Sequence, residues 1–273
     1  MFAIIICLTC ALALSLTSAF TFWPVHVWYD FYRPIVMFIA GYIGGVAISW
    51  IFIDVNGRII SSKKKNYTVP SNWAKFLLTH GIDFIDWHAR IRVKKIGLEK
   101  IPNEPLLLVC NHKSKFDPMI TAAVLKKRHI AFITKESNMK IPLGGRLMWR
   151  NCYMPVNRED KLQSLEQFKK AADLIASGAS SVGVYPEGTR QEAHVILGDF
   201  HNGAFNIAIR TGCPIVVLTM KETAMIHKNF PFKSSPVEMK CVQVLYKEDY
   251  SNMNAAELSD YVHDIMYKEL ESA

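Results

Sequence analysis

The sequence predicts an α/β domain with a mainly parallel or mixed sheet flanked by helices, preceded by an N-terminal hydrophobic helical hairpin. From residue 90 onward, short apolar runs of strand length alternate with longer segments of helical periodicity. Before residue 57, two uncharged apolar runs follow one another. The chain therefore divides into a membrane-anchoring hairpin over residues 1–56, a basic linker and amphipathic helix over residues 57–89, and an α/β domain over residues 90–273.

The two apolar runs, Phe2–Trp23 and Pro34–Ile53, are each long enough to cross a bilayer, which needs about 20 apolar residues. A cleaved signal peptide is the alternative for the first run, because Thr17-Ser18-Ala19 resembles a cleavage site. However, no Lys or Arg precedes the run, and a second apolar run follows it. We therefore expect a helical hairpin that spans the membrane or dips into one leaflet. Three glycines in its second helix suit close helix contact: Gly41, Gly44 and Gly45.

The chain is basic, with a formal net charge of +8 and a sequence pI near 9.1. Such a balance suits nucleic acid, anionic lipid or phosphorylated substrates. No nucleic-acid-binding motif occurs, and the positive charge is concentrated just after the hairpin, at Arg58, Lys63, Lys64, Lys65, Lys75, Arg90, Arg92, Lys94 and Lys95. We expect contact with membrane lipids and not with nucleic acid. By the positive-inside rule, the α/β domain is expected on the cytoplasmic side of an integral or monotopic membrane protein.

The six cysteines do not predict a metal or redox site. Cys7 and Cys10 form a CxxC pair, but they lie in an apolar helix without a second pair or a nearby histidine. The others are scattered in or beside apolar strands, so free thiols are expected.

A helix is predicted over Ser71–Trp87, with an apolar stripe that packs on the core or lies on the membrane. Its stripe comprises Trp73, Phe76, Leu77, Phe84 and Trp87. Strands are then predicted at Arg90–Ile96, Pro105–Cys110, Ile130–Thr134, Cys152–Val156, Val182–Tyr185, Ile215–Met220 and Met239–Tyr246. Further helices are predicted from Asp117, with Asp117 as N-cap and Pro118 in the first turn, and at Asp160–Ala176, Ala204–Arg210 and Asn254–Leu270.

The first candidate motif, residues 111–117 (NHKSKFD), directly follows a buried strand. His112 stands at the strand end and Asp117 at the start of the next helix, so a tight connection would bring the carboxylate against the imidazole. The carboxylate would keep one ring nitrogen protonated and leave the other free to accept a proton. Taken alone, a histidine after a strand and an aspartate before a proline are more often structural.

The second motif, residues 184–190 (VYPEGTR), also follows an apolar strand. Gly188 permits a sharp turn, Arg190 can grip a phosphate, and Glu187 can order that arginine or bind a hydroxyl. The alternative is a charged surface turn with a Glu–Arg pair.

Arg158 and Lys135 also follow predicted strands. Because the carboxyl ends of parallel strands meet at one edge of a sheet, all these side chains are expected in one cleft.

In order and spacing, NHKSKFD, the segment around Arg158 and YPEGTR resemble the glycerophosphate acyltransferase family, especially the 1-acylglycerol-3-phosphate acyltransferases. The segment GDFHNGAFNIAIRTGCPIVV resembles the family's next conserved block, and the likeness covers about Ile91 to Met220. Three residues depart from the common pattern, namely Asn157, Tyr185 and Gln191.

The resemblance implies a membrane-bound enzyme that moves a fatty acyl group from an acyl thioester to the free hydroxyl of 1-acylglycerol 3-phosphate, in phospholipid synthesis. His112 would be the general base and Asp117 its orienter. The acceptor would be bound by Lys135, Arg158, Glu187, Gly188, Thr189 and Arg190. The donor would be acyl-coenzyme A or an acylated acyl carrier protein, with no metal and no further cofactor.

Two alternatives remain open. The acceptor could be another lysophospholipid, or the chain could be a membrane-tethered lipid-binding module without catalysis. A serine or metal hydrolase is disfavoured, because neither GxSxG nor HExxH occurs.

Overall fold

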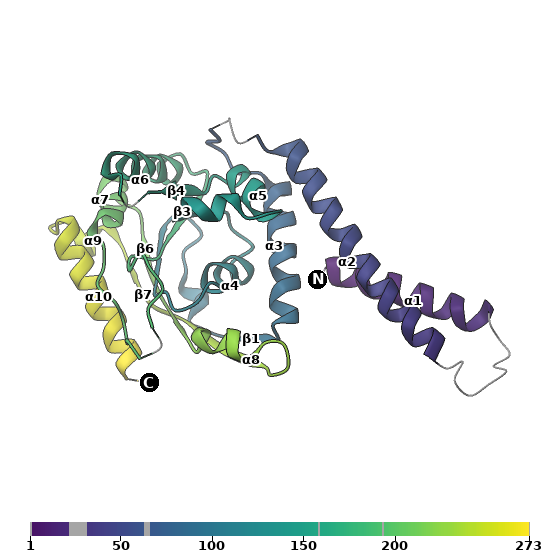
Figure 1. The fold of residues 1–273 in the computed structure, drawn as a ribbon. Helices are drawn as coiled ribbons and strands as arrows, with labels where there is room; N and C mark the ends of the chain where they lie inside the picture. Colours follow the sequence, from purple (N-terminus) through teal and green to yellow (C-terminus); the bar gives the residue numbers. More distant parts are fainter. Residues whose placement is uncertain (1, 22–31, 63–65, 158, 193, 273) are drawn as a thin grey trace. The chain divides into compact units, whose positions relative to one another are not determined.

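The computed structural model describes residues 2–21, 32–62, 66–157, 159–192 and 194–272 (Figure 1). The chain forms two compact units, Met1–Ile60 and Ser61–Ala273. Each unit is described by itself below.

The first unit is a pair of packed helices, α1 (Phe2–Thr21) and α2 (Tyr32–Ile60). Two glycines of α2 let the backbones touch, since an added Cβ would lie 2.7 Å from the Cys10 carbonyl oxygen at Gly41 and 2.7 Å from the Cys7 Cα at Gly45. Gly44 has nothing within 4 Å of such a Cβ, so it takes no part in the contact. The expected close helix contact is confirmed for two of the three glycines.

Among the described residues, one helix, Tyr32–Ile60, has the length and composition to cross a membrane, with a mean hydropathy of 2.1 in its most apolar window. The apolar stretch of α1 is shorter and covers Ala3–Ala19. The expectation that the first run spans the membrane or dips into one leaflet stays a prediction, and the end of that run at Trp23 lies outside the described residues.

The second unit is built on a seven-stranded sheet in the order β1-β7-β6-β2-β5-β3-β4. The strands are β1 (Ile91–Ile96), β2 (Leu107–Cys110), β3 (Ile130–Lys135), β4 (Met154–Val156), β5 (Ser181–Val184), β6 (Ile215–Lys221) and β7 (Ser235–Leu245). Strands β6, β2, β5, β3 and β4 run parallel, whereas β7 pairs antiparallel with β6 and parallel with β1. The predicted mixed, mainly parallel sheet is confirmed.

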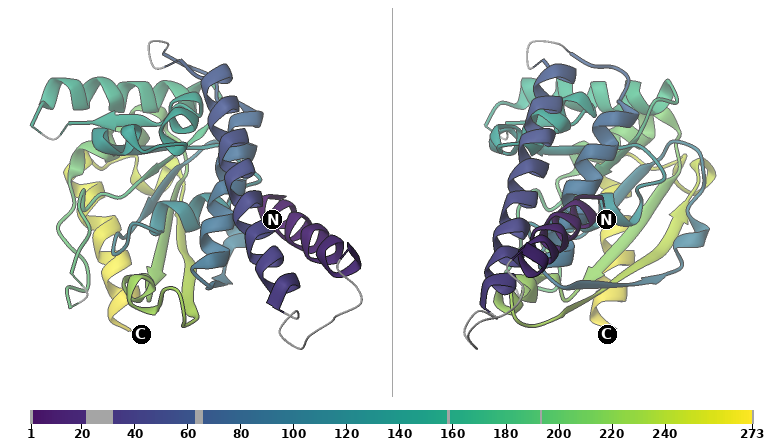
Figure 2. Two further views of the ribbon diagram at one scale, coloured as in Figure 1. Left: turned by 45° about the vertical axis from the view of Figure 1, so that its right-hand side comes forward. Right: turned by 90° about the vertical axis from the view of Figure 1, so that its right-hand side faces the viewer.

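Helices cover both faces of this sheet, as Figures 1 and 2 show. They are α3 (Asn72–His88), α4 (Asp117–Val124), α5 (Gly144–Arg150), α6 (Lys161–Ala176), α7 (Asn206–Thr211), α8 (Ile226–Asn229), α9 (Lys247–Tyr250) and α10 (Ala255–Glu271). The 3₁₀ turns are η2 (Leu98–Lys100), η3 (Glu136–Lys140), η4 (Asn202–Phe205) and η5 (Thr223–Met225).

Strand β2 shows how the core is divided. Leu107 and Val109 belong to the apolar cluster beneath α6, α7 and α10, whereas Leu108 and Cys110 belong to the cluster beneath α3 and α4. Both faces of β2 are therefore buried, which explains why its sequence is a continuous apolar run instead of an alternating one.

One local expectation is wrong. Asp117 is not the N-cap of α4, since Phe116 occupies that position and the Asp117 side chain turns back into the preceding loop.

The structure decides which face of α3 is buried. The buried side chains are Ala74, Leu77, Thr79 and Ile82, and only Leu77 belongs to the predicted stripe. The two tryptophans of that stripe, Trp73 and Trp87, are exposed, so they do not pack on the core, and contact with the membrane stays a prediction.

Candidate active site

The site begins where the central strand β2 ends. The side chain of Asn111 continues the sheet by accepting a hydrogen bond from the Met220 N–H (2.7 Å) and donating one to the Met220 carbonyl (2.9 Å). This pair of bonds clamps the end of β2 to β6, 109 residues further along the chain. The backbone of the next residue, His112, is therefore held in place at the carboxyl end of β2.

His112 and Asp117 form the pair that their spacing predicted. The His112 Nδ1 atom lies 2.8 Å from Asp117 Oδ2, and the Asp117 side chain is fully buried while that of His112 is 17% exposed. The same carboxylate oxygen accepts hydrogen bonds from the N–H groups of Lys113 and Ser114, each 2.7 Å away. These bonds hold the carboxylate facing the imidazole, which requires Nδ1 to carry the proton.

In that tautomer His112 Nε2 carries a lone pair. Among the residues that the structure describes, none hydrogen bonds to Nε2, and the ring is partly exposed. Nε2 is therefore available to accept a proton from a bound hydroxyl.

Tyr185 supports the imidazole from beside it. The two rings have centroids 4.7 Å apart, and the Tyr185 hydroxyl lies 3.1 Å from Thr121 Oγ1, which donates to the Asp117 carbonyl. Burial raises the pKa of Tyr185, so it remains a neutral phenol beside the imidazole. Sequence reasoning noted Tyr185 only as a departure from a family pattern, although its place directly after β5 pointed to the site.

Glu187 connects the two motifs. Its Oε1 accepts the His112 N–H at 2.5 Å and its Oε2 accepts the Gly198 N–H at 3.0 Å. The side chain is 2% exposed, and burial raises its pKa, although the two N–H groups and the nearby Lys113 ammonium act in the opposite direction. Both carboxylate oxygens are therefore engaged with the backbone, and neither pairs with Arg190 in this structure.

The rest of the second motif forms a turn beside the first motif. Gly188 adopts a φ of 66°, a left-handed conformation that favours glycine, and its N–H donates to the Tyr185 carbonyl. The Gln191 N–H donates to the His112 carbonyl at 2.9 Å, so the exposed Thr189 and Arg190 lie on a loop tied to the histidine backbone. Lys113 also ties this loop down, since its Nζ donates to the carbonyls of Glu192 and Val195.

The remaining two predicted residues are placed less directly. Lys135 is exposed at the carboxyl end of β3, which is separated from β2 by β5. It therefore shares the edge of the sheet with His112 without joining the two motifs. Arg158 lies outside the described residues.

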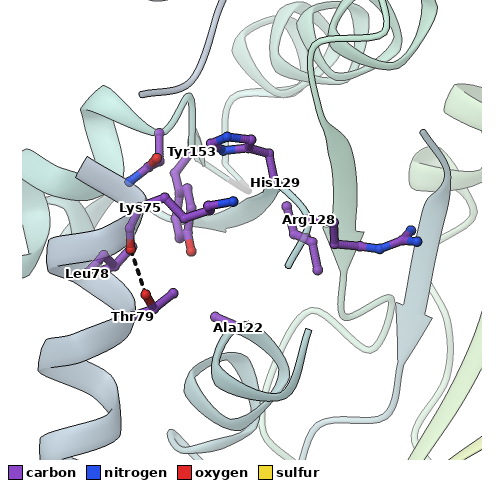
Figure 3. A pocket seen from close by; sticks show the side chains of 9 residues that line it. Lys75, Leu78, Thr79, Ala122, Arg128, His129 and Tyr153 are labelled. Carbon is purple, nitrogen blue, oxygen red and sulfur yellow. Dashed lines mark hydrogen bonds between the residues drawn. The ribbon is translucent and has the colours of Figure 1, made fainter. Parts of the chain in front are cut away.

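A small cavity lies at the opposite edge of the sheet, where β3 and β4 begin (Figure 3). Lys75, His129 and Tyr153 line it together with Thr79 and Asn151. Burial and the nearby Lys75 ammonium lower the pKa of His129. Because this cavity is at the amino ends of the strands, it does not belong to the His112 site.

The part of the chain that the structure describes contains no group of three His, Cys, Asp or Glu side chains able to hold a metal ion. Together, the fold and the bond between His112 and Asp117 define an α/β protein with a His–Asp pair at the carboxyl ends of the parallel strands.

Comparison with known proteins shows which proteins this domain is similar to. Residues 92–221 match the sequence model of the family described as Acyltransferase. The chain is 32% identical over 174 residues to a 1-acyl-sn-glycerol-3-phosphate acyltransferase of Chlamydomonas reinhardtii, a match that covers 62% of this chain and 50% of the relative. It is 36% identical over 132 residues to a chloroplastic 1-acyl-sn-glycerol-3-phosphate acyltransferase of Brassica napus, covering 48% of this chain and 37% of the relative.

The fold is also that of a solved structure, the 1-acyl-sn-glycerophosphate acyltransferase from Thermotoga maritima. The TM-score is 0.57 at 20% sequence identity, with 83% of this chain and 96% of that chain covered. Residues 92–221 therefore match the acyltransferase family that the ordered motifs resembled. It spans half or less of the length of the two relatives from Chlamydomonas reinhardtii and Brassica napus.

Proposed function

We propose that this protein is a membrane-bound acyltransferase that moves a fatty acyl group from an acyl thioester to the free hydroxyl of 1-acylglycerol 3-phosphate. The observation that carries the proposal is the bond between His112 Nδ1 and the buried Asp117 carboxylate. That bond leaves a base at Nε2, next to a loop that bears Arg190. The acyltransferase relatives named above support the reaction class.

In the proposed reaction, the acceptor hydroxyl donates a hydrogen bond to His112 Nε2. As the hydroxyl oxygen attacks the thioester carbonyl carbon, its proton passes to Nε2. The imidazolium that forms is stabilised by the Asp117 carboxylate. When the tetrahedral intermediate collapses, the C–S bond breaks and the Nε2 proton passes to the departing sulfur. The products are a diacyl lipid and a free thiol, with no acyl-enzyme. A base positioned in this way contributes a rate factor of about 10²–10⁴.

The acceptor phosphate is assigned to the cations that follow the strands. Arg190 and Arg158 would grip it, Lys135 would add positive charge, and Thr189 and the Gly188 backbone would offer hydrogen bonds. The resemblance also implied acceptor contact for Glu187. Because both of its oxygens accept backbone N–H bonds, we assign it instead to positioning the His112 peptide.

The donor would be acyl-coenzyme A or acylated acyl carrier protein, and no resident cofactor is required. Since α2 has the composition of a membrane helix and Arg58 lies in its last turn, we place the α/β unit on the cytoplasmic side. There it would meet amphiphilic substrates at the bilayer.

The test is turnover of acyl-coenzyme A with 1-acylglycerol 3-phosphate in vesicles, comparing wild type with His112→Ala. Thiol release and diacyl product are both measured. Wild type is expected to need the acceptor and to form diacyl product, and His112→Ala is expected to lose activity while keeping its melting temperature. Substantial activity in the variant would remove His112 as the base.

Two other results would favour alternatives. Thiol release without acceptor would indicate a hydrolase. Lipid binding by folded protein, with no turnover on either donor or on other lysophospholipids, would indicate a binding module.

A further inference from the structure

A cluster of large aromatic side chains is exposed on the α/β unit. Phe232 is 85% exposed and Phe230 is 52% exposed in the loop around α8, and Trp87 is 51% exposed at the end of α3. We refer to residues 225–234 as the α8 loop. Large aromatic side chains that are exposed on neighbouring segments of a folded domain are characteristic of a contact surface.

The loop is held in a defined conformation. Ile226 is fully buried beneath it, and the N–H groups of Phe230 and Lys233 donate to the carbonyls of Ile226 and Asn229. Arg90, directly after α3, donates from Nη1 to the Phe232 carbonyl at 2.6 Å, and its own carbonyl accepts the Ser235 N–H at 3.0 Å. These bonds join the loop to the end of α3 and hold the backbone that carries the two phenylalanines.

The two segments that carry the aromatic residues are basic. Neither residues 87–95 nor residues 225–236 contain Asp or Glu. The exposed cations of these two segments are Arg90, Arg92, Lys94, Lys95, Lys228 and Lys233. Only Lys94 has an acidic partner, Glu238, among the described residues. Aromatic side chains within a basic rim match the interface of an anionic bilayer, where aromatic rings enter the headgroup layer and cations meet lipid phosphates.

The strand topology places this surface at the end of the sheet where His112 lies. Strand β6 ends at Lys221 and leads directly into the turn before α8. Because β7 is antiparallel to β6, both β7 and its parallel neighbour β1 begin at that same edge. His112 follows β2, which is parallel and adjacent to β6. Figure 1 shows α8 beside the start of β1 at this end of the sheet.

We propose that the α8 loop and the end of α3 form a second membrane contact, in which Phe230, Phe232 and Trp87 enter the headgroup layer of an anionic bilayer. The contact presents the His112 edge of the sheet to the lipid surface. A second copy of the chain is a poorer partner, because two basic surfaces repel each other. The immersion itself does not depend on the proposed reaction, and only its effect on turnover rests on the proposed function.

The immersion is measured on the full chain, reconstituted in phosphatidylcholine vesicles with and without phosphatidylglycerol. Phe232→Cys is spin-labelled, and its collision rates with oxygen and with a water-soluble nickel chelate are compared. Oxygen concentrates in the bilayer and the chelate in water. The ratio of oxygen collisions to chelate collisions is therefore several-fold higher for a label in the headgroup layer than for a label in water. We expect this shift with phosphatidylglycerol present.

The matched control label is Ile209→Cys, since Ile209 is also an exposed apolar residue but lies on α7, which leads into the opposite end of β6. Unmodified protein is labelled in parallel, because Cys10 is half-buried while the other five thiols are buried. If the label at 232 collides with the chelate as often as the label at 209, the proposal is overturned. Amide exchange of residues 225–235 in unmodified protein gives a second readout, with slower exchange expected in anionic vesicles.

The effect on turnover is tested with Phe230→Ser combined with Phe232→Ser. Turnover of lipid in anionic vesicles should fall about tenfold, equivalent to about 1.4 kcal/mol, whereas Ile209→Ser should leave it unchanged. Turnover of a short-chain acceptor dissolved in water should not change in either variant. An immersed label in a protein without turnover would remove the proposed function and leave the membrane contact standing. A water-exposed label in an active protein would overturn the membrane contact and leave the proposed function standing.

Discussion

At the residue scale, the site depends on where one buried carboxylate points. Asp117 Oδ2 accepts three hydrogen bonds, from the imidazole and two backbone N–H groups. An amide oxygen in its place could accept the same bonds, but it carries no negative charge. We therefore expect Asp117→Asn to lower kcat by about 10²–10⁴-fold, because the neutral amide cannot stabilise the imidazolium that forms when His112 accepts a proton.

This prediction is checked by steady-state kinetics of Asp117→Asn beside circular dichroism of the same sample. The acceptor KM should change little, since Asp117 is buried and does not reach the substrate. A variant with wild-type kcat would mean that the carboxylate does not orient the base.

Glu187 and Arg190 lie in the same motif but should respond differently. Glu187→Gln replaces one acceptor of a backbone N–H by a donor, so it should lower the free energy of unfolding by about 1–3 kcal/mol and reduce kcat. Arg190 is exposed, so Arg190→Ala should leave the melting temperature unchanged and raise the acceptor KM. Thermal unfolding measures the stability of each variant, and initial rates at increasing acceptor concentration give its KM. An equal loss of stability in both variants would contradict these roles.

Asp86 on α3 should make stability depend on pH. Burial, with a contribution from Asp83, raises the pKa of Asp86 from 3.8 to about 7. The folded state then binds the Asp86 proton more tightly than the unfolded state does. The contribution of Asp86 to the free energy of unfolding is therefore largest below pH 3.8 and falls as pH rises toward about 7.

Asp86→Asn should therefore melt at a higher temperature than wild type at pH 8, with the difference shrinking as pH falls through this window. Glu166→Gln, on the exposed side of α6, serves as the control. A difference that stays constant from pH 4 to pH 8 would show that Asp86 does not titrate in this window.

At the scale of elements, the contact between α1 and α2 depends on two glycines one turn apart. A leucine at Gly41 would place its Cβ within 3 Å of the α1 backbone, so Gly41→Leu should destabilise the helix pair by about 1–3 kcal/mol. Gly44→Leu is the matched control because that position is open. Amide hydrogen exchange of residues 2–21 in detergent should accelerate only in Gly41→Leu, and equal acceleration in both variants would contradict the contact.

The position of α4 shows how an element serves the site. It begins at Asp117, directly after the loop that its own first carboxylate holds through the N–H groups of Lys113 and Ser114. The helix start and the orientation of the base are thus stabilised by the same hydrogen bonds. This coupling explains why the distance between His112 and Asp117 in the sequence is short.

At the scale of the whole molecule, both apolar clusters of the α/β unit lie entirely within residues 61–273. We therefore expect residues 61–273 alone to fold, with a melting temperature within a few degrees of the full chain. Thermal unfolding followed by circular dichroism checks this, and failure to fold would mean that the first unit contributes to the core.

The shortened chain should also bind membranes differently. Without α2 it should lose salt-resistant association with vesicles and keep a weaker association, which anionic lipid strengthens and high salt removes. Vesicle sedimentation at low and high ionic strength measures both. Salt-resistant binding by residues 61–273 would contradict the assignment of the anchor to α2.

The sequence by itself determined most of the architecture, because strand and helix periods are local properties of the chain. All seven strands of the sheet were predicted within a few residues, β7 being the least accurate at its start. The order of NHKSKFD and YPEGTR was also sufficient to identify the acyltransferase domain. Short elements such as α5 were missed, because a helix of 7 residues gives too few turns for a periodic pattern.

Only the tertiary structure decided what the side chains contact. Glu187 reaches the backbone of a residue 75 positions away, and no local pattern reports that bond. The same holds for Tyr185 beside the imidazole and for the face of α3 that is buried. Periodicity states that a helix has two faces, whereas the neighbouring elements determine which face they cover. The sequence therefore predicted that His112 and Asp117 form a pair, and the folded chain determined which groups hold that pair in place.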